Sequence, residues 1–260
     1  MTVCGGGHSS SGASSSEGMV IDLRKMRKVK VDTEAMTVEF EGGCLWEDVD
    51  NALERHGLAT VGGVVNHTGV GGLTLGGGHG YLTPRHGLTI DNLLEADVVL
   101  ADGTIVEASE DKDANLFWAI RGAGAQFGVV TRFLSRAHQQ VKVWSDKIRE
   151  IAQDATAYAN RGDYYDVLTL FGWEDPDHDG EVREFNRSIC RKVRETNGYQ
   201  ADSGGHWSKG PVGVYINVEA GGISPNDAWG ANLPRLRELK KKYDPQNVFN
   251  KWHSIAEDAS

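Results

Sequence analysis

A histidine set in a run of glycine and serine is the first residue of this chain whose surroundings suggest chemistry. His8 follows Gly5-Gly6-Gly7 and precedes Ser9-Ser10-Ser11-Gly12, and a second glycine-rich run extends over residues 69–80. Backbone without side chains can approach a ligand closely and direct several N–H groups at an anion. Two such runs fit a pyrophosphate held from both sides, and they fit equally well two tight turns in a β-rich fold.

Three other glycine motifs are incomplete in these runs. Gly69-Val70-Gly71 is followed by Thr74, and Gly122-Ala123-Gly124 by Phe127, so neither forms the GxGxxG sequence of a dinucleotide-binding turn. A phosphate loop ending in GK[ST] is absent from the sequence. A serine nucleophile elbow requires glycine where Ser11 stands. Although this motif is incomplete, a serine hydrolase built on residues 8–11 is kept as a rival hypothesis. It predicts reaction with a fluorophosphonate probe and a colourless protein.

The composition excludes several classes of protein. The chain has 260 residues, 39% hydrophobic and 25% charged, which is typical of a globular protein with room for two modest domains. A formal net charge of -10 argues against a nucleic-acid or acidic-membrane partner. Cys4, Cys44 and Cys190 are widely spaced and form no CxxC pair, and His67 and His79 have no HExxH pattern around them. We therefore expect neither a disulfide framework nor a bound metal.

Hydrophobic periodicity and turn signals predict a chain of short strands and helices. We expect strands at residues 19–23, 28–31, 36–40 and 127–133, helices at 46–56 and 116–120, and a hairpin of 96–100 with 105–108 around Asp102-Gly103. Residues 137–211 are more polar, with helical runs at 146–158 and 181–196 and a strand at 165–171. The tail predicts a strand at 212–218 and one helix over about 226–242, which Tyr243-Asp244-Pro245 ends.

Five ordered segments carry a family resemblance. They are residues 5–9 (GGGHS), residues 69–80 leading into 82–92, residues 116–124 with 127–131 (LFWAIRGAG and FGVVT), residues 215–217 (YIN) and residues 243–249 (YDPQNVF). Together they resemble the berberine-bridge-like FAD oxidases of the vanillyl-alcohol-oxidase family. The resemblance is dense over residues 1–136 and 212–260 and thin between them.

This resemblance implies an α+β fold built on a PCMH-type FAD-binding domain. Residues 1–136 would form that domain, 137–211 a shortened α+β substrate domain, and 212–260 a C-terminal segment that returns to contact the flavin. Family members carry a strand–helix subdomain before the GGGH loop and a longer substrate domain. We therefore expect a domain incomplete at its N-terminus, in which the strand at residues 1–4 has no partner and the chain is only weakly stable.

The resemblance also assigns roles to residues. FAD would be carried covalently on His8 through its 8α-methyl group, and Tyr215 would be the catalytic or substrate-positioning residue. The other residues assigned to the cofactor are Gly5, Gly6, Gly7, Ser9, Gly69, Gly71, Gly72, Gly76, Gly77, Gly78, Gly128, Val130, Asn217 and Asn247. Members with a second link carry a cysteine ahead of Gly69, where this chain has Val64-Val65-Asn66, so we expect a single link.

The implied reaction is oxidation of an alcohol, an amine or a related C–H bond by hydride transfer to the flavin. The expected partners are a small-molecule substrate and O2, without nucleic acid or membrane. The alternative within the same family is a non-catalytic flavin-binding remnant that has lost its substrate pocket.

Overall fold

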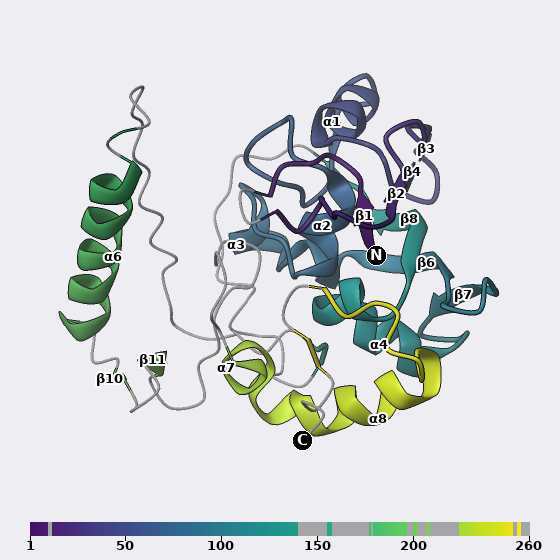
Figure 1. Cartoon of the computed structure of the whole chain (residues 1–260). Coiled ribbons are helices and arrows are strands. Elements are labelled where there is room, and N and C mark those ends of the chain that lie inside the picture. Colours follow the sequence, from purple (N-terminus) through teal and green to yellow (C-terminus); the bar gives the residue numbers. More distant parts are fainter. Residues whose placement is uncertain are drawn as a thin grey trace.

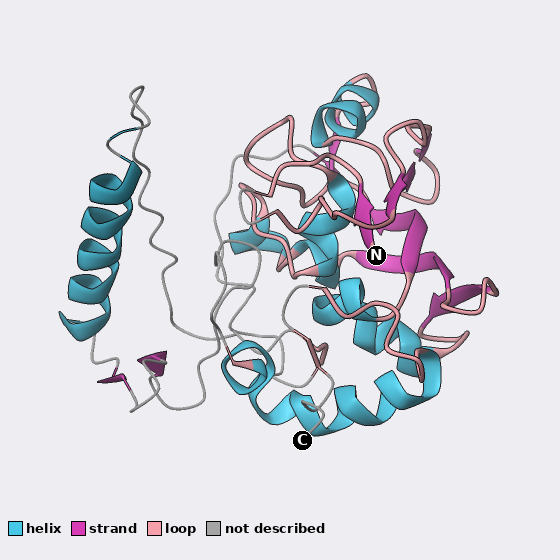
Figure 2. Cartoon of the chain, in the orientation of Figure 1, coloured by secondary structure: helices cyan, strands magenta, loops and turns pink. Residues whose placement is uncertain are grey.

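A computed structural model of the chain describes residues 1–9, 12–139, 155–157, 177, 179–196, 200–201, 207–208, 224–251 and 254–255. Figures 1 and 2 show an α+β arrangement in which strands and helices lie against one another, while helix α6 (Asp179–Thr196) stands apart from them. The strands expected at 165–171 and 212–218, and all but three residues of the helix expected at 146–158, lie outside the described residues. Of the helices that the structure describes, none is long and apolar enough to cross a membrane.

The central sheet has five antiparallel strands in the order β3-β4-β8-β6-β7. They are β3 (Val29–Asp32), β4 (Thr37–Glu41), β8 (Val129–Arg136), β6 (Leu93–Val99) and β7 (Ile105–Ser109). Alternation along β4 buries Val38 and Phe40 on one face, as the sequence predicts for a half-buried strand. Phe40 pairs with Phe133 of β8 and stacks on its ring at 5.5 Å between centroids, which places the core on this face.

Helix α1 (Trp46–Glu54) covers the core at the β4 side of the sheet. Its apolar stripe of Trp46, Val49 and Leu53 is fully buried, and Trp46 lies edge-on to Phe40 with 5.9 Å between ring centroids. The side chain of Asp48 accepts a hydrogen bond of 2.8 Å from the N–H of Leu45, which closes the first turn. The helical spacing of the apolar residues thus predicts both this helix and its buried face.

The second glycine-rich run contains a helix, which corrects the expectation of an extended loop. α2 (Val70–Leu75) begins after Gly69, and the loop that remains precedes α3 (Thr83–His86) and a 3-10 turn at Thr89–Asp91. Val70 and Thr74 are fully buried, while Leu73 and Leu75 pack against the core. Burial of these side chains outweighs the low helix propensity of Gly71 and Gly72.

The first strand is paired, which corrects the expectation of an open edge. β1 (Thr2–Cys4) runs parallel to β2 (Val20–Asp22) in a separate two-stranded sheet, with Thr2 opposite Val20. Met1 and Val3 also pack in a small cluster with Phe249 from the C-terminal segment. The chain therefore supplies both a partner strand and an apolar cover for β1. A second short pair joins β5 (Leu58–Ala59) to β9 (His138–Gln139).

The expected hairpin and the expected helix after it are both present. β6 and β7 are joined through Leu100, whose N–H donates to the carbonyl of Thr104 at 2.8 Å, and Gly103 at φ +86 closes the turn. α4 (Ala114–Ala123) begins two residues earlier than predicted, after Asp113, whose side chain accepts from the N–H of Leu116, and its backbone departs from helical angles at Arg121 and Gly122. A short 3-10 turn, Gly124–Gln126, leads from α4 into β8.

The C-terminal helix is divided in two, where the sequence predicts a single helix. α7 (Pro225–Trp229) ends at Gly230, which has φ +47, and a 3-10 turn over Gly230–Asn232 leads into α8 (Leu233–Tyr243). α8 buries Leu233, Leu236 and Leu239 and packs on α4. Residues 179–208 include α6 (Asp179–Thr196), which confirms the helix expected at 181–196. They also include the paired strands β10 (Gln200–Ala201) and β11 (Trp207–Ser208).

Candidate functional site

The two glycine-rich runs meet backbone to backbone. A Cβ on Gly6 would lie 2.4 Å from the backbone nitrogen of Gly69, and a Cβ on Gly69 would lie 2.4 Å from the backbone nitrogen of Gly6. Gly5 also lies close to neighbouring backbone, since a Cβ on it would come within 2.9 Å of the carbonyl oxygen of Gly42. Only residues without a side chain permit this approach. Residues 5–9, the first glycine loop, and residues 69–80, the second glycine segment, therefore form one site.

His8 projects from the first glycine loop beside a second histidine. Gly7 has φ +65, a backbone conformation that favours glycine, and it turns the chain so that Gly7, His8 and Ser9 are exposed. The imidazole of His67 lies edge-on to that of His8, with 5.0 Å between ring centroids and 63° between ring planes. The sequence gives His67 no role, although its position ahead of Gly69 places it in the loop where some family members carry a second flavin ligand.

In the second glycine segment, the first turn of α2 is more accessible to a ligand than the three glycines that follow the helix. Gly71 and Gly72 stand in the first turn of α2, where N–H groups have no carbonyl partner within the helix. A Cβ on Gly72 would meet nothing within 4 Å. Gly76, Gly77 and Gly78 are buried, and the carbonyls of Gly77 and Gly78 accept hydrogen bonds from Ile90 and Thr89. These last three glycines therefore fix the turn against the 3-10 helix.

Gly128 and Val130 lie at the start of β8. A Cβ on Gly128, which has φ +158, would come within 2.6 Å of the carbonyl of Val99. Val130 is only 3% exposed and its side chain belongs to the main core. Any contact that Val130 makes with a ligand must therefore come from its backbone.

Asn247 is held in place by a buried ion pair. Lys240 Nζ donates to Asp244 Oδ2 at 2.7 Å, to the carbonyl of Gln126 at 2.6 Å and to the carbonyl of Phe249 at 2.7 Å. Asp244 in turn accepts from the N–H groups of Val248 and Phe249, both at 2.8 Å. These bonds join the C-terminal segment to the residues that precede β8.

The side chain of Asn247 carries a polar atom that remains available. Asn247 has φ +51, and its buried Oδ1 has no hydrogen-bond partner among the described residues. Val248 and Phe249 pack with Val3 and Ile21, so Asn247 adjoins the strand that leads into the first glycine loop. Tyr215 and Asn217, the other two residues assigned to this segment, lie outside the described residues.

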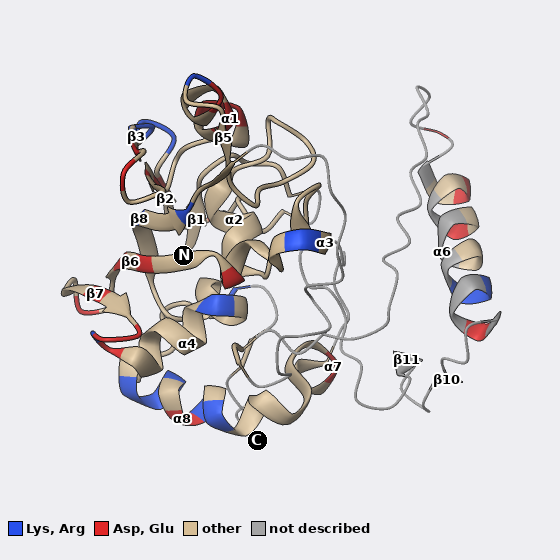
Figure 3. Cartoon of the chain, turned by 180° about the vertical axis from the view of Figure 1, so that it is seen from behind, with Lys and Arg blue, Asp and Glu red and all other residues tan. Residues whose placement is uncertain are grey.

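An acidic cluster on the sheet is not a second site. Glu95, Asp97 and Glu107 offer carboxylate oxygens within 4.8 Å of one another, on strands β6 and β7 (Figure 3, in which Asp and Glu are red). Arg132 lies among them: its Nε donates to Asp97 at 2.7 Å, and its terminal nitrogens pair with Glu95 and Glu39. The hydrogen bonds that Arg132 donates to the Asp97 carboxylate raise the pKa of Arg132 above its usual value. The cluster is therefore a compensated cross-strand ion-pair network.

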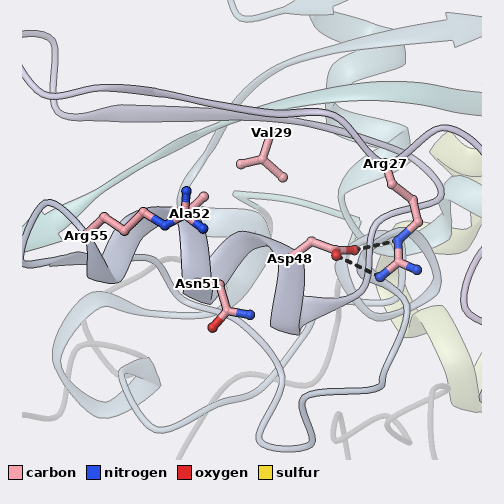
Figure 4. A pocket seen from close by; sticks show the side chains of 6 residues that line it. All are labelled: Arg27, Val29, Asp48, Asn51, Ala52 and Arg55. Carbon is pink, nitrogen blue, oxygen red and sulfur yellow. Dashed lines mark hydrogen bonds and ion pairs between the residues drawn. The ribbon is translucent and has the colours of Figure 1, made fainter.

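The groove of about 310 Å³ beside α1 is also separate from the glycine loops (Figure 4). Arg27 donates to both carboxylate oxygens of Asp48, at 2.8 and 2.7 Å, and Asp48 also caps α1. The residues that line the groove all lie outside the two glycine segments, 5–9 and 69–80. They are Arg27, Val29, Asp48, Asn51, Ala52 and Arg55. Its paired charges are explained by the start of the helix.

Comparison with known proteins identifies the family. Residues 1–109 match the family described as "FAD binding domain", and residues 214–256 match "Berberine and berberine like". The FAD-linked oxidoreductase pgmH of Aspergillus terreus is 32% identical over an alignment of 409 residues, which covers 98% of this chain and 82% of that protein. The chain therefore belongs to the berberine-bridge-like FAD-linked oxidoreductases of the vanillyl-alcohol-oxidase family, and FAD is the cofactor of that family.

Other relatives match little more than half of the chain. (R)-6-hydroxynicotine oxidase of Paenarthrobacter nicotinovorans is 37% identical over 160 residues, which is 58% of this chain and 35% of that enzyme. The structure of 6-hydroxy-D-nicotine oxidase from Arthrobacter nicotinovorans is similar with a TM-score of 0.52 and 39% identity, over 53% of this chain and 31% of that one. Glucooligosaccharide oxidase from Acremonium strictum, whose FAD is described as 6-S-cysteinyl and 8α-N1-histidyl, has a TM-score of 0.50 and 37% identity, over 53% and 30%.

The residues present fit FAD. Each glycine at the Gly6–Gly69 contact leaves no space for a side chain, while Gly72 faces open space in which a ligand can lie. The first-turn amides of α2 suit a pyrophosphate, and the unpaired Oδ1 of Asn247 can accept a hydrogen bond from a ligand N–H or O–H. The amides of α2 and the Oδ1 of Asn247 come from segments far apart in the sequence.

Proposed function

We propose that this chain is a flavin-linked oxidase that holds FAD on His8 and oxidises a small molecule, with O2 as the final acceptor. The observation that supports the proposal is the backbone contact between Gly6 and Gly69, which joins the loop that carries His8 to the residue before the first turn of α2. A pyrophosphate bound by that turn would lie next to the first glycine loop. Covalent histidyl flavin in the similar glucooligosaccharide oxidase supports His8 as the point of attachment.

In this proposal the residues of the chain bind and orient the cofactor. The N–H groups of Gly71 and Gly72 would donate to the pyrophosphate, and Asn247, held by the Lys240–Asp244 pair, would accept from the cofactor. A covalent link to His8 would withdraw electron density from the ring system and so favour hydride acceptance. FAD would supply the hydride acceptor. We assign substrate positioning to Tyr215 and a further flavin contact to Asn217, on the strength of their YxN sequence.

The substrate class follows from the relatives. The names of similar proteins include a nicotine oxidase and carbohydrate oxidases, which act on an amine and on sugars. We therefore propose an amine or an alcohol as substrate. The alignment with pgmH is longer than this 260-residue chain, so the relative carries internal sequence that this chain lacks. This supports a flavin domain at residues 1–136, a reduced substrate domain at 137–211 and a returning segment at 212–260.

Anaerobic mixing tests the proposal and separates it from a non-catalytic remnant. The purified protein would be mixed without oxygen with 6-hydroxynicotine, with an oligosaccharide and with simple aromatic alcohols, while the visible flavin absorbance is followed. Bleaching by one of these compounds, slowed in Tyr215→Phe, is the expected result, and admission of air should restore the colour. A flavin that none of the compounds reduces would favour the remnant.

A further inference from the structure

The ring of His67 contacts the proposed attachment point, and the family motifs give His67 no role. Its imidazole is edge-on to that of His8 at 5.0 Å between centroids, and both side chains are exposed. Among the described residues, the one cluster of three side chains able to ligate a metal includes neither histidine. The pair is therefore not explained by a metal centre.

The backbone on both sides fixes this pair of rings. Residues 65–68 form a turn, in which the N–H of Thr68 donates to the carbonyl of Val65 at 3.1 Å. The start of α1 holds the same turn: Glu47 N–H donates to the carbonyl of Asn66 at 2.9 Å, and Trp46 N–H to that of Thr68 at 3.0 Å. On the other side, the tight Gly6–Gly69 contact fixes the loop that carries His8. The two imidazoles thus project from two loops that are anchored to α1 and to each other.

We propose that His67 is a positioning residue that assists formation of the bond between His8 and the flavin. This inference rests on the proposed attachment at His8. In the overall step, one C–H bond of the 8α-methyl group and the N–H bond of the His8 imidazole are replaced by a C–N bond. The two electrons and two protons released pass to O2, which leaves as hydrogen peroxide.

A neighbouring imidazole has the properties that this step requires. His8 can form the bond only through a ring nitrogen that carries a lone pair, so its proton must be on the other nitrogen or be removed. A neutral His67 can accept that proton, directly or through one water, and its ring contact restricts the rotation of His8. The exposed side chains of Val64 and Val65, 52% and 41% accessible, flank this place in the same loop and offer an apolar edge for a methylated ring.

The test measures attachment and needs no substrate. Full-length protein produced under riboflavin limitation would be mixed with FAD, and the fraction of flavin that stays on the polypeptide after acid precipitation would be followed in time. The variants are His67→Gln, His67→Ala with and without added imidazole, and His8→Ala. The matched control is His56→Gln, an exposed histidine just past the end of α1.

We expect His67→Gln to bind FAD but to attach it about 100-fold more slowly than wild type, as for loss of a proton-transfer group. Imidazole should accelerate attachment in His67→Ala, and His56→Gln should match wild type. Attachment at the wild-type rate in His67→Gln, loss of all FAD binding in that variant, or no effect of imidazole would each overturn the inference. If wild-type flavin is acid-labile, the attachment at His8 itself is wrong, and the role of His67 falls with it.

Discussion

The α-carbon of Gly6 and the backbone nitrogen of Gly69 lie so close that a methyl group on Gly6 would come within 2.4 Å of that nitrogen. The contact joins residues from the first and the second glycine-rich run, and no flexible side chain is available to give way. Both the position of His8 and that of the first turn of α2 depend on it. The two glycines are therefore positions of the proposed cofactor site at which a side chain cannot be accommodated without a shift of the backbone.

Gly6→Ala and Gly69→Ala should each separate the two loops. Overpacking of this kind costs ~1–3 kcal/mol, so we expect a lower melting temperature together with a smaller amount of bound FAD. Gly180→Ala is the control, because a Cβ at Gly180 in α6 would meet nothing within 4 Å. Thermal unfolding and the flavin-to-protein absorbance ratio measure both effects. Wild-type values in the two loop variants would mean that the loops are not in contact.

The C-terminal segment should depend on Lys240. Lys240 and Asp244 are 4% and 1% exposed, so Lys240→Met leaves a buried carboxylate without its cation. Loss of one partner of a buried pair typically costs ~3–5 kcal/mol. Lys241→Met, which replaces the exposed neighbouring lysine, should change stability little. Urea unfolding compares the two variants, and equal midpoints would contradict the anchoring role of the pair.

The stability of the protein should fall in mild acid because of His138. Its ring stacks on that of His86 at 3.7 Å between centroids, and its Nε2 is 2.7 Å from Asn92 Oδ1. Burial, followed by the charges of His86, Arg136 and Arg85, lowers the pKa of His138 to about 4. The unfolded chain, with an ordinary histidine pKa of ~6.5, takes up the proton first.

This contribution to stability is complete above pH ~6.5 and is lost as the pH falls towards the folded value of about 4. His138→Gln cannot be protonated, so its melting temperature should decline less than that of wild type between these two values. His56→Gln, at an exposed site, should follow the wild-type curve. Parallel curves for wild type and His138→Gln would show that His138 titrates normally.

The flavin should have a single covalent link. Val65 stands where a second ligand would be needed, and Cys44 is fully buried, with burial raising the pKa of its thiol to about 12. A thiol that remains protonated is a poor nucleophile. Peptide mapping by mass spectrometry should find flavin on the peptide that contains His8. An adduct on Cys4, Cys44 or Cys190 would disprove a single histidyl link.

The sequence predicts local elements better than their connections. Alternation in residues 36–40 and the apolar stripe from Trp46 to Leu53 identify β4 and α1, because one strand or helix face is buried in each. The sheet order β3-β4-β8-β6-β7 depends on pairing between distant segments, which periodicity does not encode. The glycine run at residues 69–80 is typical of an anion-binding loop, whereas burial of Val70 and its apolar neighbours stabilises helix α2 within it.

The site was predictable to a similar extent. The motif sequences indicate that Gly6, Gly69 and His8 belong together, and the structure brings the two loops into contact. Neither the ring contact of His67 nor the buried Lys240–Asp244 pair follows from a motif, because both depend on where loops distant in sequence are fixed. The pairing of β1 with β2 also escapes prediction, since residues 1–4 carry no signal for their partner.

The most direct measurement of the central claim is acid precipitation of the purified protein followed by the visible spectrum of pellet and supernatant. Because His8 lies at the contact of the two glycine loops, the account predicts a yellow protein whose flavin stays in the pellet for wild type. In His8→Ala the flavin should pass to the supernatant. A colourless protein, wild-type flavin released by acid, or flavin retained by His8→Ala would contradict covalent attachment at His8.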